Sequence, residues 1–247
     1  MSKASTYRFA DFTRASYARL LKSAAKRFVF SSFDDFQRGT NEALWRHDLD
    51  FSVHAGLAMA RMEAKVGIKS TYFFLLSSEF YSLLEKSVRA AAKEILALGH
   101  GAGLHFDPRD HDIHDEPGLI QALKRDNSLL ENLLSQKVSS FSFHYPRTET
   151  GDFSKLRYAG LINAYAPKFT RGVTYCSDSN GYWRHQRLID VVQNAEGPLH
   201  VLTHPEWWGP TVMSPRERIV RCATGRSNAQ MRFYDRLIRE AGRKNVT

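Results

Sequence analysis

The most constraining feature of this sequence is a repeated alternation between short apolar runs typical of buried strands and longer amphipathic segments typical of helices. Helical periodicity over residues 17–26 leads into strand-like runs at 27–30 and 44–50. Further strands are predicted at 70–76, 102–106 and 138–143, and helices at 53–66, 79–98 and 117–136. Because helices separate the strands, we expect an α/β fold with parallel strands, a distorted (β/α) barrel. An open doubly wound sheet is the alternative, although no glycine-rich phosphate motif follows the first strands.

The pattern loosens after residue 143 but continues to the C-terminal segment. Strands are predicted at 172–176 and 199–203, with a helix at 187–193 between them and a long helix at 215–241 that we expect to break near Gly225. No linker or internal repeat divides the chain, so we expect a single domain over residues 1–247. Residues 1–40 would form a helix-strand preface packed on the barrel.

Composition narrows the class of protein. A hydrophobic content of 43% is enough for a sizeable core, and no apolar run approaches the roughly 20 residues of a transmembrane helix. The first six residues lack the apolar core of a secretory signal, and there are only two cysteines, so we expect a cytoplasmic protein with reduced thiols. The net charge of +9 is spread at spacings typical of solvated helix faces, which predicts no specific nucleic-acid binding.

Polar side chains follow the ends of several predicted strands. Asp48 and Asp50 are one residue apart, and alternation along a strand would point them to the same side. Two neighbouring carboxylates repel, which is relieved if one binds a cation and the other acts as a base. Other apolar runs end at His105, His144 and His204. These ends predict one site built from several strands.

The segment His47-Asp48-Leu49-Asp50 resembles the first motif of the polysaccharide deacetylase family, also called carbohydrate esterase family 4, in its divergent members with a spaced aspartate pair. The resemblance covers residues 17–208 and rests on the order and spacing of several motifs. It implies that Asp48 is the general base and that Asp50 binds a divalent metal, usually zinc. The alternative for both residues is a charged strand end that caps a neighbouring helix.

Histidines supply the remaining metal ligands that the resemblance implies. Residues 99–105 resemble the glycine-rich entry into the family's metal histidine, here His105. Four residues later the family usually has a second histidine, and this chain has Arg109. Either His144 or His111 would then supply the third ligand. We favour His144, because strand ends hold ligands more precisely than a loop and a tetrahedral zinc site needs three protein ligands.

Two later segments resemble the family's remaining motifs. Residues 175–184 resemble its Asp/Trp motif, in which Asp178 would orient catalytic partners while Trp183 and Arg184 contact substrate. Asp178 could equally be a turn residue. Leu202-Thr203-His204 resembles the final motif and makes His204 the general acid, with helix capping or core hydrogen bonding as the alternative.

Trp207 and Trp208 directly follow this last motif. Tryptophans beside a polar site often stack on sugars, and buried core positions are an equally good interpretation. Together the motifs predict a zinc-dependent deacetylase of an N- or O-acetylated sugar, including a nucleotide sugar or a polysaccharide precursor. The alternatives are a hydrolase of a non-sugar amide on the same scaffold and a noncatalytic carbohydrate-binding protein, which Arg109 would favour.

Overall fold

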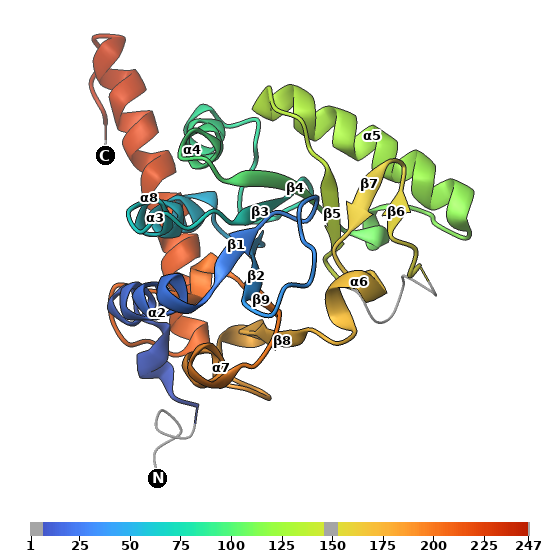
Figure 1. The fold of residues 1–247 in the computed structure, drawn as a ribbon. Coiled ribbons are helices and arrows are strands. Elements are labelled where there is room, and N and C mark those ends of the chain that lie inside the picture. Colours follow the sequence, from blue (N-terminus) through green and yellow to red (C-terminus); the bar gives the residue numbers. More distant parts are fainter. Residues whose placement is uncertain (1–6, 146–152, 247) are drawn as a thin grey trace.

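One curved sheet organises the fold (Figure 1). The computed structural model describes residues 7–145 and 153–246, and within them the strand order is β6-β7-β5-β4-β3-β2-β9-β8, with β1 beside β2. All pairs are parallel except β6 with β7. The strands are β1 (Val29–Ser31), β2 (Glu42–Leu49), β3 (Thr71–Leu75), β4 (Gly101–Phe106), β5 (Ser140–Phe143), β6 (Arg157–Tyr158), β7 (Leu161–Asn163), β8 (Thr174–Ser177) and β9 (Leu199–Thr203).

Helices cover the outer face of this sheet, so the predicted α/β fold with a distorted barrel is confirmed (Figure 1). The barrel is open, because among the described residues β8 and the β6–β7 end do not hydrogen-bond to each other. The α-helices are α2 (Arg14–Arg27), α3 (Val53–Ala64), α4 (Lys86–Ala97), α5 (Glu116–Leu134), α6 (Pro167–Thr170), α7 (Leu188–Asn194) and α8 (Pro215–Glu240). Short 3-10 helices are η1 (Phe9–Phe12), η2 (Pro108–Asp110), η3 (Ser179–Gly181) and η4 (Pro205–Trp207).

Strand β2 is buried on both faces and carries polar groups on each. On the outer face His47 bonds to Glu63 of α3, with 2.7 Å between Nε2 and Oε1, and to Thr203 of β9. Glu63 also accepts hydrogen bonds from the hydroxyls of Tyr17 and Tyr72. The fully buried Glu63 carboxylate is therefore well satisfied, which is the condition for burying a charge beneath α2 and α3. The inner face of β2 is left for other groups.

An aromatic cluster fills the inside of the open barrel. Phe33 and Phe73 meet edge to face, and Phe33 and Phe169 do the same. Gly103 on β4 lets Phe73 of β3 approach closely, since a Cβ built there would lie 2.3 Å from the ring. This packing closes one end of the interior and leaves the carboxyl ends of the parallel strands for the candidate site.

Four elements differ from the sequence prediction. Helix α4 begins at Lys86 instead of residue 79, and the preceding segment places the Tyr81 hydroxyl between the ends of β2 and β3, where it donates to Leu49 O and accepts from Leu75 N. The short strands β6 and β7 were not predicted. Helix α8 runs unbroken through Gly225, because a glycine in a helix costs only about 1 kcal/mol and a Ser214 capping box fixes its start.

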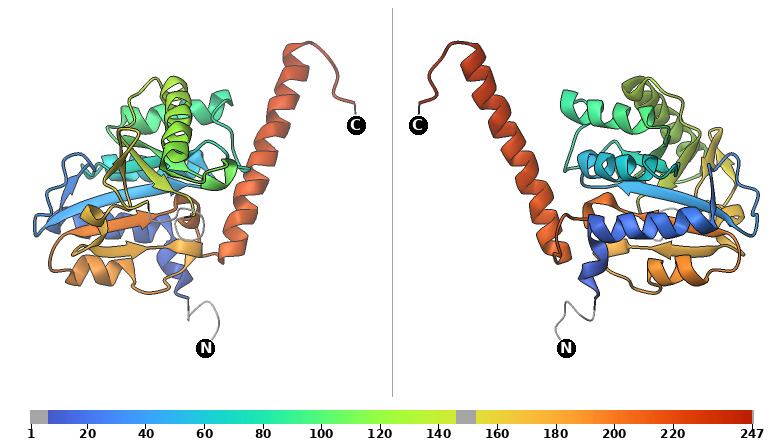
Figure 2. Two further views of the ribbon diagram at one scale, coloured as in Figure 1. Left: turned by 90° about the vertical axis from the view of Figure 1, so that its right-hand side faces the viewer. Right: turned by 60° about the vertical axis from the view of Figure 1, so that its left-hand side comes forward.

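Helix α8 leaves the body of the molecule and extends away from it (Figure 2). Its first half is held by arginines: Arg218 donates to Gly181 O, Arg221 to Glu206 O, and Arg226 to Phe80 O and Glu85. Across the described residues, no helix combines the length and the apolar character needed to cross a membrane.

Candidate functional site

Asp50 lies in the turn directly after β2, and neighbouring groups fix that turn. Its backbone carbonyl accepts a hydrogen bond of 2.7 Å from the Ser78 hydroxyl. Two residues later, the Ser52 hydroxyl accepts from Ala55 N and caps the start of α3. The chain therefore has to leave the sheet at this point, and the Asp50 carboxylate is directed across the strand ends.

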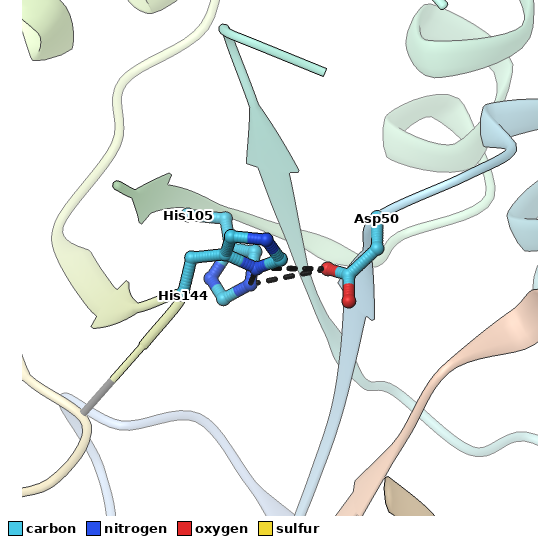
Figure 3. Close-up of side chains that lie close together, drawn as sticks. All are labelled: Asp50, His105 and His144. Carbon is cyan, nitrogen blue, oxygen red and sulfur yellow. Dashed lines mark hydrogen bonds and ion pairs between the residues drawn. The ribbon is translucent and has the colours of Figure 1, made fainter. Parts of the chain in front are cut away.

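Asp50, His105 and His144 point toward one another from the ends of β2, β4 and β5 (Figure 3). Asp50 Oδ1 lies 3.2 Å from His105 Nε2 and 3.5 Å from His144 Nδ1, and the two imidazole nitrogens are 3.0 Å apart. The backbone N–H of His144 continues the parallel ladder to Phe106 O at 2.9 Å. The cluster that the sequence favoured is thus brought together by regular strand pairing.

The three groups fit a divalent cation. Their candidate ligand atoms all lie within 4.8 Å of one another, and one carboxylate with two imidazoles is a donor set that suits zinc. Asp50 Oδ1 is buried without a hydrogen bond from any described residue, as expected of an atom with room for a ligand. Burial alone would raise the pKa of Asp50, but the contacts with His105 and His144 outweigh it and hold that pKa well below its usual value.

Ser142 orients the His105 ring. Its hydroxyl lies 2.7 Å from His105 Nδ1, and the two residues are register partners on β5 and β4. With Nδ1 engaged, Nε2 is the nitrogen that faces Asp50. Such a partner on the far nitrogen is typical of imidazoles that bind metal.

Asp48 lies on the inner face of β2, beside the cluster. Its Oδ2 is 3.7 Å from His105 Nε2 and accepts a hydrogen bond of 3.1 Å from Arg46 Nη2. The Arg46 side chain is fully buried, donates to the Tyr165 hydroxyl at 2.8 Å and stacks over that ring. Asp48 Oδ1 has no hydrogen-bond partner among the described residues and the residue lines a cavity, so one carboxylate oxygen is positioned by Arg46 and the other is available.

Asp178 holds His204 on the opposite side of the cluster. The buried carboxylate accepts from His204 N at 3.0 Å, bonds to His204 Nδ1 at 2.7 Å and accepts from Trp208 Nε1 at 2.8 Å. His204 Nε2 is thereby turned toward Asp50, 3.9 Å from Oδ2. Burial alone would lower the pKa of His204, but the hydrogen bond and negative charge of Asp178 outweigh it and raise that pKa to about 10. His204 is therefore protonated at neutral pH.

A cavity of about 810 Å³ opens beside these groups. Asp48, His105, His144 and His204 form one wall. The lining also includes three tyrosines and several polar residues, among them Tyr145, Tyr165, Tyr175, Ser177, Arg184 and His185. An acyl group with a polar, ring-shaped leaving group is the kind of molecule that such a lining can accept.

The predicted substrate-binding residues fall into two groups. Arg184 lines the cavity, whereas Trp183 stacks on Phe12 and donates to Asp11 outside it. Trp207 and Trp208 are buried, with 7% and 2% of their surface exposed. The structure therefore corrects the expectation of a tryptophan stacking platform, because the short helix η4 turns both indoles into the core.

His111, the alternative third ligand, and Arg109, which stands where the family usually has a histidine, both have other partners. His111 stacks on Phe106 and bonds to Asp126 at 2.9 Å. Arg109 pairs with Asp107 at 2.6 Å and lies over the Tyr145 ring. His144 therefore completes the cluster with Asp50 and His105, whereas Arg109 is not part of it. Pro146, which follows in the same motif, lies outside the described residues.

Sequence reasoning missed Arg46 and Ser142. Both stand two residues before a predicted site residue on the same strand, so period-2 alternation would have placed Arg46 with Asp48 and Ser142 with His144. The tyrosines Tyr165 and Tyr175 carried no comparable signal, because they reach the cavity from segments whose course the sequence pattern did not predict.

Fold and site together define an α/β protein with a candidate metal site at the carboxyl ends of parallel strands, where the Asp48 carboxylate and the His204 imidazole lie beside it. Neither a scan against protein-family models nor a search of curated proteins finds a match.

A search of solved structures finds chains whose names fall in the family that the motifs resemble. A Streptococcus pyogenes deacetylase, PplD, in complex with acetate is 15% identical, covering 84% of this chain and 85% of that one, with a TM-score of 0.43. The Bacillus subtilis peptidoglycan deacetylase PdaC is 12% identical over 83% and 96%, with a TM-score of 0.43. BA3943, a CE4 family pseudoenzyme from Bacillus anthracis, is 14% identical. The match covers 74% of this chain and 60% of that one, with a TM-score of 0.42. Identities of 12% to 15% with TM-scores of 0.42 to 0.43 do not assign a function to this chain.

Proposed function

We propose that this chain is a metal-dependent hydrolase that removes an acetyl group from an N- or O-acetylated sugar. One observation carries the proposal: a carboxylate–imidazole cluster that fits a cation lies between a carboxylate and an imidazolium that both face it. In the hydrolysis of an amide or ester, a base takes a proton from the attacking water and an acid gives a proton to the leaving group. Both groups must therefore lie beside the same acyl carbon.

Each group has a defined task in this reaction. Asp50, His105 and His144 would hold the ion, and a bound divalent cation supplies a Lewis acid that polarises the acyl carbonyl and acidifies water. Asp48 accepts the proton of the attacking water on its carboxylate, and Arg46 keeps that carboxylate in place. The imidazolium of His204 then donates the proton at Nε2 to the departing amine or alkoxide.

Asp178 is a positioning residue in this scheme. It bonds to Nδ1 of His204, which leaves the Nε2 proton directed at the site. The negative charge of Asp178 also stabilises the imidazolium, and the pKa of His204 is accordingly raised to about 10. An imidazolium held in place by a buried carboxylate can supply the proton that an amine needs in order to leave from an amide.

The acetylated sugar is proposed from the motif resemblance and from the cavity lining. Tyr145, Tyr165 and Tyr175 offer aromatic rings with polar hydroxyls, and Arg184 adds a charged donor at the wall. Aromatic rings combined with hydrogen-bonding groups suit the mixed apolar and hydroxylated faces of a sugar. The candidate substrates are therefore acetylated oligosaccharides and nucleotide sugars.

The test is acetate release from both groups of substrates, after loading with zinc or another divalent ion. His204→Gln should slow amide hydrolysis by about 100-fold or more, the usual scale for a positioned proton-transfer group, and slow an activated ester much less. Asp48→Asn should lower hydrolysis of both substrates by a similar factor. Because this change leaves the buried Arg46 charge without its partner, Arg46→Met/Asp48→Asn is the matched control for a loss caused by unfolding.

The outcomes separate the alternatives. No acetate from any sugar, together with hydrolysis of a non-sugar amide, would move the proposal to another substrate class. Metal and sugar binding without hydrolysis in the folded wild type would support the noncatalytic binding protein that Arg109 first suggested. Unchanged hydrolysis in Asp48→Asn would remove the proposed base.

A further inference from the structure

The distal half of α8 has two distinct faces, and no other helix or strand among the described residues packs on it. Arg226 is held to the body by Phe80 O and Glu85, the C-terminal part of the helix stands clear of the body (Figure 2), and Arg218 is the only buried residue among the described residues of the helix. One side of this half carries large apolar residues at helical spacing, which are Met231, Phe233, Tyr234, Leu237 and Ile238. The first four are 45% to 58% exposed. A soluble helix normally buries such a stripe against something.

The opposite side of the same segment is basic. Arg232, Arg236 and Arg239 follow at four and three residues and therefore lie on one side of the helix. They line a hollow of about 390 Å³ together with Asp235 and Glu240. Between Arg216 and Lys244 there are nine basic and three acidic residues, a large part of the net charge of +9. Beyond Arg226 the chain has five basic residues, at 232, 236, 239, 243 and 244, against Asp235 and Glu240, so this distal segment is net positive.

We propose that the distal half of α8 docks onto the surface of an anionic phospholipid membrane. A helix with aromatic and aliphatic residues on one side and arginines on the other lies in the plane of a bilayer interface. Its apolar side enters the acyl boundary, and its long arginine side chains reach back to the phosphates. The Arg236 guanidinium already lies 5.2 Å from the Phe233 ring centroid, at the border between the two faces.

Charge argues against a second copy of this chain as the occupant. Two such helices packed through their apolar stripes would leave both sets of arginines on the outer sides of the pair, where only Asp235 and Glu240 of each helix lie near them. The concentration of positive charge instead complements an anionic surface, where each basic residue adds to the attraction. This inference goes beyond the proposed hydrolase function and does not depend on it.

The test is co-sedimentation of the full chain with vesicles of phosphatidylcholine alone and of phosphatidylcholine mixed with phosphatidylglycerol. We expect binding to the mixed vesicles that weakens with added salt. Arg232→Gln/Arg236→Gln/Arg239→Gln should weaken it on the order of 100-fold, since each basic residue near a charged surface contributes about fivefold. Phe233→Ser/Leu237→Ser should weaken it by at least about tenfold through lost apolar burial.

The matched control removes three charges elsewhere. Lys22→Gln/Lys26→Gln/Lys124→Gln changes exposed lysines on α2 and α5 and should bind as the wild type does. Circular dichroism and thermal unfolding should show that all variants are folded, because every changed side chain is exposed. Equal binding to both kinds of vesicle, an equal loss in the lysine control, or full binding by Phe233→Ser/Leu237→Ser would overturn the proposal. So would a dimer in solution that Phe233→Ser/Leu237→Ser abolishes while the wild type ignores vesicles.

Discussion

Replacement of Arg46 by methionine should destabilise the protein strongly. The side chains of Arg46 and Asp48 are 0% and 2% exposed and lie 3.1 Å apart, so the ion pair is largely shielded from bulk water. Asp48 Oδ1 has no hydrogen-bond partner among the described residues, and the guanidinium is the partner of Oδ2. Arg46→Met therefore leaves a buried carboxylate uncompensated, which costs about 3–5 kcal/mol.

This cost can be measured by urea and thermal unfolding at neutral pH in the presence of a chelator, so that no cation replaces the lost charge. For a chain of this size it corresponds to a fall in Tm of about 10 °C. Arg46→Met/Asp48→Asn removes both charges and should recover at least about 2 kcal/mol of the loss. Arg61→Met breaks the exposed Arg61–Glu94 pair on the surface and should cost less than about 1 kcal/mol.

Two results would refute this reasoning. If Arg46→Met lies within about 1 kcal/mol of the wild type, the Asp48 carboxylate does not depend on the guanidinium. If the double variant is no more stable than Arg46→Met, the loss comes from packing against Phe73 and Tyr165 and not from charge.

Other predictions concern metal affinity, pH and packing. Ser142→Ala removes the partner of His105 Nδ1 and should lower zinc affinity by about 10- to 100-fold in a competition titration. Burial raises the pKa of Glu63, but the charge and hydrogen bond of its histidine neighbour outweigh it and lower that pKa, so its contribution is present above about pH 4.3 and lost as the pH falls through the lower folded pKa. The difference in unfolding free energy between the wild type and Glu63→Gln should accordingly shrink between pH 6 and pH 3. Gly103→Ala places a methyl group against the Phe73 ring and should cost about 1–3 kcal/mol in urea unfolding.

The sequence predicted the strands that are buried on both faces better than the connections between them. Continuous apolar runs identify β3, β4 and β9 because parallel strands covered by helices leave no room for polar alternation. The two or three residues of β6 and β7 are too short for any periodicity to show. The late start of α4 follows from a tertiary contact, the Tyr81 hydroxyl on Leu49 O, which local propensity does not report.

The candidate site was predictable where it depends on strand ends. Asp50, His105 and His144 meet because neighbouring parallel strands end at one edge of the sheet. The positions of Trp207 and Trp208 were not predictable, because the sequence is the same whether η4 turns the indoles outward or into the core. The role of Asp178, as an orienting residue or a turn residue, could not be decided from the sequence for a similar reason, since its bonds to His204 join residues 26 positions apart.

The two polar faces of β2 make this strand intolerant of changes in length. His47 belongs to the network of Glu63 on one side, and Asp48 belongs to the cavity on the other. Because side chains alternate, inserting or deleting a single residue within β2 would exchange the two sets. The Asp48 carboxylate would then turn from the cavity to the face that carries Glu63, and the His47 imidazole would turn away from Glu63. A change that most loops would absorb would here disrupt a structural network and a candidate catalytic centre together.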